Sequence, residues 1–432
     1  MPGPGHPDLS PERPAMSNHK EAYDIAVIGG GPAGSMAAII ASSRGKRVVL
    51  IEKNGSLGKK LLMTGKTRCN ITNICPVDTF IEKFGKTGPF LRSSLFRFSN
   101  EDLMEFFRSK GLEMKAERQG RVFPVTDKAS SVLKVLEDAL SENKVDIMLD
   151  SGIENIKKEG DDFILETAGD KKIRCGKVIL AAGGASYKAT GSEGDGFRLA
   201  KKLGHDVKKL RAGLVPLITR ETWVKDLQGL GLENIKITFI SKHKKLKSAV
   251  GELMFTHFGV SGPLVLDLSG EVTDILEKEK EVMLHIDLKP GLRDEQLESK
   301  LLHKFLTKGH SFLKSIMKDI LPARMIPVFL MVAKVGPLKT ANQITKPERL
   351  SIVKLLKGLP LTVTGSLPIE EAMVTDGGVA TQEIDPRTME SKIVAGLYFA
   401  GEIIDGAAPS GGYNLQQAFS TGYLAGEEAS NA

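Results

Sequence analysis

The sequence predicts an α/β fold in which one parallel-sheet domain is built from two segments and a second, β-rich domain is inserted between them. Three observations lead to this prediction. An apolar strand runs directly into a glycine-rich turn and a helix near residue 30, which is how a Rossmann-like βαβ unit begins. Residues from about 190 to 375 change to isolated strands followed by a block of helices. From about 375 the glycine-rich α/β pattern returns, so the chain re-enters the first domain.

The glycine-rich turn is the most specific signal in the chain. The first strand ends in Gly29-x-Gly31-x-x-Gly34, an Ala-rich helix follows, and the next strand ends on Glu52, 18 residues after Gly34. Gly29 permits the tight turn, Gly31 lets the backbone approach a pyrophosphate, and Gly34 lets the helix pack closely on the strand. The helix N-terminus offers free N–H groups to phosphates. Glu52 is placed to accept hydrogen bonds from a ribose, so the pattern predicts a dinucleotide site.

The rest of the first segment predicts two helices, a meander and a buried strand. Apolar residues at helical spacing place one helix through Leu103 and Phe107 and another through Val132 and Leu140. Alternating patterns then predict strands at 152–157, 163–167 and 172–175, followed by a separate buried strand, 177–184, that ends in glycines. This arrangement is more typical of an FAD domain than of an NAD domain.

The inserted region is expected to be β-rich with a helical block. Strands are predicted at 214–217, 235–240 and 281–288. Asp294 is predicted to cap a helix, and Pro347 to open another that ends near Gly358.

The second segment is predicted to return to the parallel sheet. Residues 396–402 form a buried strand, expected to lie beside the first strand of the chain, and Gly411 is expected to begin the final helix. The predicted boundaries are 1–20 for a disordered extension, 21–190 and 373–432 for the parallel-sheet domain, 191–290 and 359–372 for the insert, and 291–358 for the helical subdomain.

Composition narrows the functional classes. The net charge of +7 invites a nucleic-acid partner, but lysine-rich pieces such as 242–247 lack interleaved aromatics, which favours a solvated surface instead. No apolar run reaches the roughly 18 residues of a membrane span. The three cysteines have neither disulfide nor zinc-site spacing and the histidines are not spaced as metal ligands, so no metal is expected. The cysteine usage and the absence of a signal peptide predict a cytoplasmic protein. Met16 is an alternative start to Met1, and the oligomeric state is left open.

Several motifs are together similar to one known group of proteins. They are VIGGGPAG (27–34), GKKLLMTGKTRCNITN (58–73), GRVFP (120–124), VILAAGGASY (178–187), GSEGDGF (191–197), GELMFTHFGVSGP (251–263), AMVTDGGVA (372–380), TMESK (388–392) and the segment from Gly396 to Gly426. On these residues the chain resembles the BaiN/YhiN-like flavoproteins, a bacterial group described as NAD(P)/FAD-dependent or aminoacetone-oxidase-like oxidoreductases. Lys66-Thr67 and Ala407-Ala408-Pro409 depart from the usual family residues and bear on the shape of the flavin pocket.

The resemblance implies a two-segment, non-covalent FAD domain whose insert carries a helical subdomain. It also implies that the helix opened by Gly411 faces the flavin. The residues expected to bind FAD are Gly29, Gly31, Pro32, Ala33, Gly34, Glu52, Lys53, Lys60, Thr64, Gly65, Arg68, Cys69, Asn70, Ala182, Gly183, Gly401, Glu402, Asp405, Gly411, Gly412, Tyr413, Asn414 and Leu415.

Candidate proton donors are fewer. His257 lies in an apolar, glycine-rich part of the insert, and insert domains of this arrangement normally form the substrate wall, so His257 is a candidate catalytic acid. Tyr413 is a second candidate and Tyr187 a third. A structural role for His257 is as well supported by the pattern as a catalytic one. Cys69 lacks a CxxC partner and is interpreted as a packing group rather than a redox thiol.

The expected activity is that of an FAD-dependent oxidoreductase acting through flavin N5 on a small or steroid-like molecule. The preferred form is an NAD(P)H-linked reductase of enone-type double bonds. Only one GxGxxG unit is present, so NAD(P)H, if used, visits the flavin transiently. The alternatives are an amino-ketone or amine oxidase using O₂, an RNA-modifying flavoprotein suggested by the +7 charge, and a non-catalytic flavin sensor.

Overall fold

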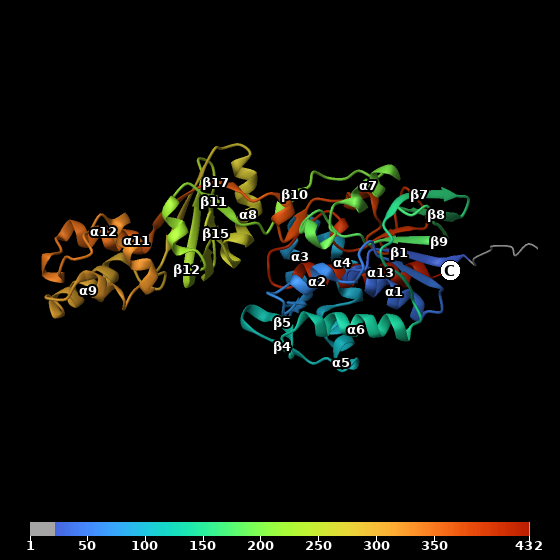
Figure 1. The fold of residues 1–432 in the computed structure, drawn as a ribbon, viewed down its shortest axis with the longest axis horizontal. Helices are drawn as coiled ribbons and strands as arrows, with labels where there is room; N and C mark the ends of the chain where they lie inside the picture. Colours follow the sequence, from blue (N-terminus) through green and yellow to red (C-terminus); the bar gives the residue numbers. More distant parts are fainter. Residues whose placement is uncertain (1–21, 432) are drawn as a thin grey trace, which may run out of the picture.

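The computed structural model describes residues 22–431 and shows three parts arranged in a row (Figure 1). A parallel-sheet domain lies at one end, a small β-domain lies in the middle, and a helical subdomain lies at the other end. The predicted disordered extension, 1–20, and the choice between Met1 and Met16 fall outside the described residues.

The parallel-sheet domain is α/β and Rossmann-like, as predicted. Its sheet runs in the order β6-β2-β1-β9, and all of these neighbours are parallel. The strands are β1 (Tyr23–Ile28), β2 (Val48–Ile51), β6 (Asp146–Met148) and β9 (Lys172–Leu180). Four consecutive residues of β1 are buried, as expected for a strand covered on both faces. β7 (Ile153–Glu159) and β8 (Asp162–Thr167) continue the sheet as an antiparallel hairpin.

The return segment joins the sheet differently from the prediction. β19 (Leu397–Phe399) is parallel to β9, with Leu397 opposite Val178, so β9 separates it from β1. The two strands predicted at 172–175 and 177–184 are in fact the single strand β9, which ends at Leu180. Its first half pairs with β8 and its second half with β19, so one long strand serves two neighbours in line along the same edge.

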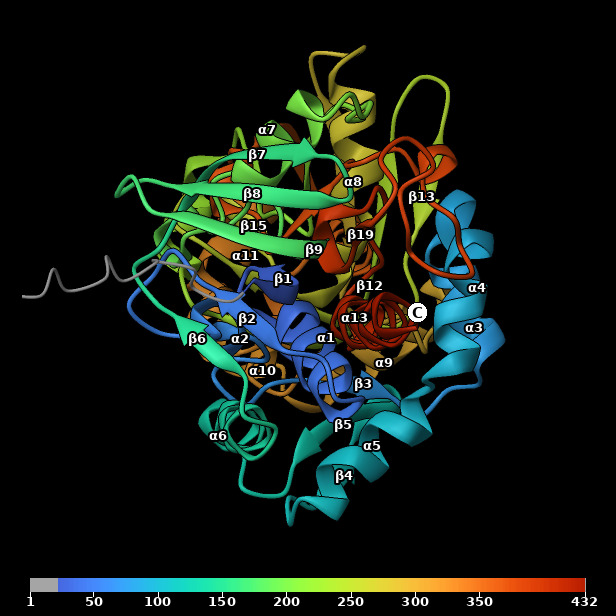
Figure 2. The same ribbon diagram turned by 90° about the vertical axis from the view of Figure 1, so that its right-hand side faces the viewer.

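Two helices from opposite ends of the chain pack side by side (Figure 2). They are α1 (Pro32–Ser43) and α13 (Tyr413–Ser430). A Cβ atom on Gly422 or Gly426 would lie 2.3 or 2.4 Å from carbonyl oxygens of α1, so only glycine permits this approach. Because α13 packs on the helix of the glycine-rich turn, the second segment is fixed against the first.

The remaining elements of this domain surround the sheet. They are α2 (Lys59–Met63), β3 (Thr72–Asn73), α3 (Val77–Lys83), α4 (Gly88–Arg97), α5 (Asn100–Ser109), β4 (Met114–Ala116), β5 (Arg121–Pro124), α6 (Ala129–Glu142) and α7 (Asp195–Lys202).

The insert is a small antiparallel barrel. Its pairings close into a ring because β12 contacts both β14 and β16, and the short strand β13 pairs with β12 alone and so lies outside the ring. Helix α8 (Pro263–Leu276) packs against several of the strands. The strands are β11 (Leu217–Thr219), β12 (Gly231–Ile240), β13 (Lys245–Lys247), β14 (Gly251–Phe255), β15 (Gly259–Ser261), β16 (Val282–Asp287) and β17 (Leu359–Ser366). The chain crosses between domains on β10 (Arg211–Gly213) and β18 (Val374–Asp376), which pair antiparallel.

The helical subdomain is inserted between β16 and β17 and consists of α9 (Asp294–Thr307), α10 (Leu313–Met317), α11 (Ile326–Ala333) and α12 (Lys346–Lys357). Asp294 is the first residue of α9 and not its cap, which is Arg293; Pro347 is the second residue of α12, after the cap Thr345. Similarly, α13 begins at Tyr413 because Gly411 and Gly412 have positive φ and cannot continue a helix backwards. Among the helices of residues 22–431, none combines the length and apolar character that crossing a membrane requires.

Candidate active site

A large cavity lies between the parallel-sheet domain and the barrel. Its volume is about 1170 Å³, above the roughly 300–1,000 Å³ of a single small-molecule pocket, so it has room for a cofactor and a substrate. One wall is made where parallel strands end, at Ile28, Ile51 and Ala181. The other is made by the barrel, including Leu232 and Leu266. Ligands of open α/β sheets bind at this carboxyl edge.

The glycine turn has the geometry that a pyrophosphate site requires. Gly29 has φ +109°, and a Cβ there would lie 2.4 Å from the Ala181 carbonyl oxygen. A Cβ on Gly34 would lie 1.9 Å from the Gly29 carbonyl oxygen, so α1 can only approach the strand through glycine. Gly31 differs from both, because its φ of −83° is ordinary and a Cβ would meet nothing within 4 Å. Gly31 lines the cavity, and its missing side chain leaves open the space in front of the N-terminus of α1.

Glu52 braces this turn. One of its carboxylate oxygens accepts a hydrogen bond from the Gly30 N–H at 2.8 Å, and the other accepts one from the Asn54 N–H at 2.9 Å. Glu52 also lines the cavity. It therefore holds the glycine turn in place in addition to the ribose role predicted from the sequence.

A half-buried ion pair lies in the cavity wall. The Lys60 ammonium contacts both oxygens of Glu402, at 2.8 and 2.9 Å. Ser186 donates to the same carboxylate at 3.0 Å, and the Thr375 N–H donates at 2.8 Å. Burial alone would raise the pKa of Glu402, but the Lys60 charge and these hydrogen bonds hold it below the usual value. The pair ties α2 to the return segment across the cavity wall.

Replacing Glu402 with Gln should lower the free energy of unfolding by about 1–2 kcal/mol, because the half-buried Lys60 ammonium loses its counter-charge. The pair stabilises the fold above the pKa of an unfolded Glu and loses that effect as pH falls through the depressed folded pKa. The difference between wild type and variant should therefore shrink on acidification. Denaturant titrations across pH would measure it, with Glu193→Gln, which breaks the exposed Lys53–Glu193 pair, as control. Equal losses in both variants would contradict this account.

The loop after α2 has an unusual backbone. Lys66, Thr67 and Cys69 all have positive φ, which costs energy for residues other than glycine and is concentrated at functional sites. The Arg68 side chain pairs with Glu117 and lies over the Phe123 ring at 4.2 Å, so its charge is already balanced by the protein.

Cys69 is fully buried, and burial raises the pKa of its thiol to about 12. Such a thiol stays protonated at neutral pH, in keeping with a packing role.

Four buried side-chain polar atoms have no partner within the described residues, and two of them, Asn70 Oδ1 and Ser192 Oγ, belong to residues that line the cavity. The other two are Ser35 Oγ and Thr219 Oγ1. Unpaired buried polar atoms are costly and call for a ligand. Together with the open space at Gly31 and the N–H groups at the start of α1, they fit a cofactor rich in phosphate and hydroxyl groups, as FAD is.

Most residues predicted to bind the cofactor line this cavity. Five predicted site residues do not: Gly34 lies under the turn and Cys69 is buried behind the loop, while the other three are Asp405, Tyr413 and His257. Those that line it are Gly29, Gly31, Pro32, Ala33, Glu52, Lys53, Lys60, Thr64, Gly65, Arg68, Asn70, Ala182, Gly183, Gly401, Glu402, Gly411, Gly412, Asn414 and Leu415.

The two leading catalytic candidates lie away from the cavity wall. The Tyr413 ring packs edge-on against Phe80 with centroids 5.2 Å apart, and burial raises the pKa of its hydroxyl to about 12. His257 is exposed in the turn between β14 and β15 and contacts the Phe258 ring. Their catalytic roles stay predictions, and these positions do not favour them.

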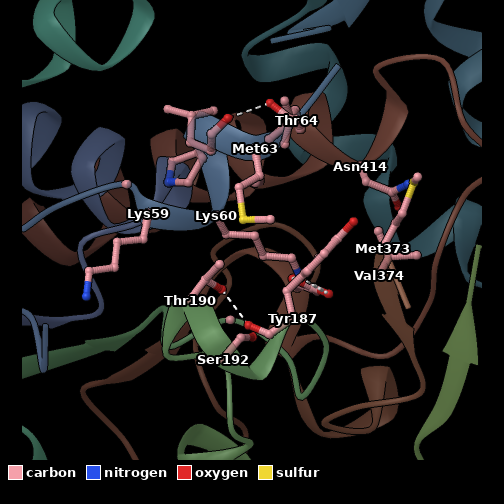
Figure 3. A pocket seen from close by; sticks show the side chains of 18 of the residues that line it. Lys59, Lys60, Met63, Thr64, Tyr187, Thr190, Ser192, Met373, Val374 and Asn414 are labelled. Carbon is pink, nitrogen blue, oxygen red and sulfur yellow. Dashed lines mark hydrogen bonds and ion pairs between the residues drawn. The ribbon is translucent and has the colours of Figure 1, made fainter. Parts of the chain in front are cut away.

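Tyr187 is the titratable hydroxyl that does line the cavity (Figure 3). It follows β9 in a left-handed backbone conformation, φ 55°, which is uncommon for an aromatic residue. Burial, and secondarily the nearby Glu371 charge, raise the pKa of its hydroxyl above the usual value. Lys60 and Met63 extend toward Tyr187 from the opposite wall.

An apolar part of the cavity wall was not predicted from the sequence. Met63, Met254 and Met373 line the cavity although each side chain is partly exposed, and Leu214 joins them. They come from α2, β14 and the crossing before β18, so no local pattern relates them. Ser192 was also missed, because a lone serine in a glycine-rich loop carries no signal.

No group of three or more His, Cys, Asp or Glu side chains within residues 22–431 is arranged to hold a metal ion.

Comparison with known proteins gives matches along almost the whole chain. The model of the HI0933-like protein Rossmann domain matches residues 23–428. A 3-dehydro-bile acid delta(4,6)-reductase from Clostridium scindens is 32% identical over 408 residues, covering 94% of this chain and 98% of that protein. A ribosomal RNA dihydrouridine synthase from Escherichia coli is 29% identical, with the same coverage of 94% and 98%. Among solved structures, the open conformation of a flavocytochrome c3 fumarate reductase aligns with a TM-score of 0.50 at 18% identity, covering 95% of this chain and 78% of that one, which shows a shared fold.

Proposed function

We propose a reaction for this chain from one premise: it belongs to the HI0933-like protein family, whose Rossmann-domain model spans residues 23–428. Family and fold make it an FAD-dependent oxidoreductase, as the sequence predicted. We infer that it reduces a carbon–carbon double bond conjugated to a carbonyl group, with NAD(P)H as the candidate electron donor.

One kind of chemistry accounts for both named relatives. The first is named for the reduction of a 3-dehydro-bile acid, and the second for making dihydrouridine in ribosomal RNA. Dihydrouridine forms when the ring double bond of uracil, which is conjugated to a carbonyl, gains a hydride and a proton. The two substrates differ in size and charge, but the reacting group is the same in each. The reaction class is therefore better supported than either substrate.

The protein has to provide the proton. FAD bound in the cavity and reduced by NAD(P)H would supply the hydride, and the substrate carbon or oxygen that becomes negative would then take a proton from the protein. Tyr187 lines the cavity, and its raised pKa keeps the hydroxyl protonated at neutral pH, so it is the candidate acid. The N-terminus of α13 also borders the cavity at Gly412 and Asn414 and favours negative charge there.

The three methionines that line the cavity favour a flat, apolar substrate or ring. Methionine side chains are flexible and polarisable, so Met63, Met254 and Met373 can adapt to a planar ring that lies against the flavin. This supports the small or steroid-like substrate that the sequence analysis preferred.

A uracil ring in RNA is the second candidate substrate, and a specific observation favours it. The helical subdomain, 291–358, has thirteen Lys and Arg against five Asp and Glu, a net charge of +8 in a chain whose total is +7. The other domains are therefore close to neutral as a group. A steroid does not require such a concentration of positive charge, whereas a polyanion does.

The test is an anaerobic reoxidation experiment. Enzyme whose flavin has been reduced with NADH, NADPH or dithionite is mixed separately with a steroid enone, with ribosomal RNA free of dihydrouridine, and with O₂. Fast return of the oxidised flavin spectrum with a conjugated carbonyl substrate, together with the reduced product by mass spectrometry, is the expected result. Reoxidation by O₂ alone would favour the amine or amino-ketone oxidase and overturn the proposal.

A further inference from the structure

The helical subdomain has no role in the active site that the structure reveals. None of its residues, 291–358, lines the cavity, and its helices contact one another and the barrel strands β16 and β17. The barrel separates it from the parallel-sheet domain (Figure 1). The subdomain lies away from the cavity and its net charge of +8 exceeds the +7 of the whole chain. We therefore expect a binding function on its own surface.

The charge is concentrated where α9 meets α10. Lys300, Lys304 and Lys308 repeat every four residues, so they share one face of α9 and its C-terminal extension, with successive side chains about 6 Å apart along the axis. Lys314 and Lys318 repeat in the same way on α10 and its end. We call these five lysines the α9–α10 patch.

One acidic side chain links the lysines of α9 to the end of α10. Asp319 accepts from Lys304 at 2.7 Å and from Lys308 at 3.4 Å, and these lysines hold its pKa below the usual range. Lys300, Lys314 and Lys318 have no acidic partner within residues 22–431. Asp319 thus draws the rows together and leaves a net charge of about +4 on one surface.

An exposed aromatic ring borders the patch. Phe312 is 46% exposed, and the Lys314 ammonium lies 5.8 Å from its ring centroid. Exposed aromatic rings beside cations are typical of surfaces that bind nucleic acid bases and phosphates together.

From this arrangement we propose that the α9–α10 patch is a docking surface for the phosphates of a folded RNA. The inference rests on the proposed reduction of a conjugated double bond, here in a uracil ring. RNA is favoured over other polyanions because one molecule has to contact both the cavity and the α9–α10 patch. Such a molecule must be long enough to extend past the barrel that lies between them. The patch provides affinity that does not depend on sequence, and the cavity selects the base.

Binding of ribosomal RNA to the holoenzyme, measured against salt between about 50 and 200 mM, tests the surface directly. The variant Lys300→Gln/Lys314→Gln/Lys318→Gln should bind about tenfold more weakly or worse, with a salt slope smaller by about 3, near one per lysine. The control Lys144→Gln/Lys171→Gln/Lys201→Gln changes the net charge equally on exposed positions of the parallel-sheet domain and should bind like wild type.

The outcomes separate this inference from the proposed function. If both triple variants weaken binding equally, or if wild type binds anionic lipid vesicles but not RNA, the docking surface is wrong even when a conjugated carbonyl reoxidises the flavin. If no conjugated carbonyl reacts, the proposed function fails while binding can still be scored. In the expected result, the patch variant raises the KM for RNA and leaves its kcat, and turnover of a free conjugated carbonyl, unchanged.

Discussion

Replacing Tyr187 with Phe is expected to slow reoxidation of the reduced flavin by a conjugated carbonyl substrate about 100-fold, within the range of general acid catalysis. Phe keeps the ring that lines the cavity and removes only the hydroxyl. The loss should appear in kcat rather than in KM, because the proton is needed after the substrate is bound. Single-turnover stopped-flow measurements would separate the two.

The pH dependence gives an independent check. Burial raises the pKa of Tyr187, so the hydroxyl is protonated below that pKa and loses its proton above it. The wild-type rate should be constant through neutral pH and fall only at a pH above the usual pKa of a tyrosine, and the fall should be absent in Tyr187→Phe.

Tyr413→Phe and His257→Ala are the matched controls, since neither residue lines the cavity. Both should react at close to the wild-type rate. A large loss in His257→Ala with none in Tyr187→Phe would restore His257, the acid that the sequence analysis placed first.

Replacing Gly31 with Val should raise the Kd for FAD about 100-fold or more while leaving the apoprotein folded. The backbone of Gly31 is ordinary and its missing Cβ meets nothing within 4 Å, so Val fits the protein without strain. Its side chain would instead occupy the space in front of the α1 N-terminus. Losing one or two charge-assisted hydrogen bonds to phosphate costs about 3 kcal/mol, which is about 100-fold in Kd.

Two other glycines make this test specific. Gly291 also has open space around it but lies in the helical subdomain, none of whose residues lines the cavity, so Gly291→Val should bind FAD normally. Gly34→Ala should lower the stability of the apoprotein itself, because its Cβ would lie 1.9 Å from a carbonyl oxygen. Flavin fluorescence titration measures the first effect and thermal unfolding of apoprotein the second. A Gly31→Val protein that retains FAD would contradict the assigned pyrophosphate position.

The sequence predicted the parallel-sheet domain well because its determinants are local. The order strand, glycine turn, helix, strand lies within about thirty residues, and Gly34 is required by the carbonyl of Gly29, only five residues before it. The long-range partner of each strand was harder to predict. The return strand was expected beside β1, but it pairs with β9, because a nine-residue β9 has room for both β8 and β19 along one edge.

The residues of the candidate site also fall into two groups, those that local sequence predicts and those that only tertiary packing places. Residues near a strand end or a helix start, such as Gly31, Glu52 and Glu402, were predicted from local pattern, since those positions face the cavity in any fold of this class. The positions of Tyr187, Tyr413 and His257 depend on tertiary packing, which places Tyr187 in the cavity wall and leaves the other two outside it.

By itself, the sequence determined a dinucleotide turn, a two-segment domain and the flavoprotein family, because these depend on backbone conformations encoded within short stretches. Tertiary structure alone decided which polar groups meet across the cavity and where the positive charge collects. Lys60 meets Glu402, and Asp319 joins two rows of lysines, because side chains distant in sequence are brought within hydrogen-bond range only when the domains and helices pack.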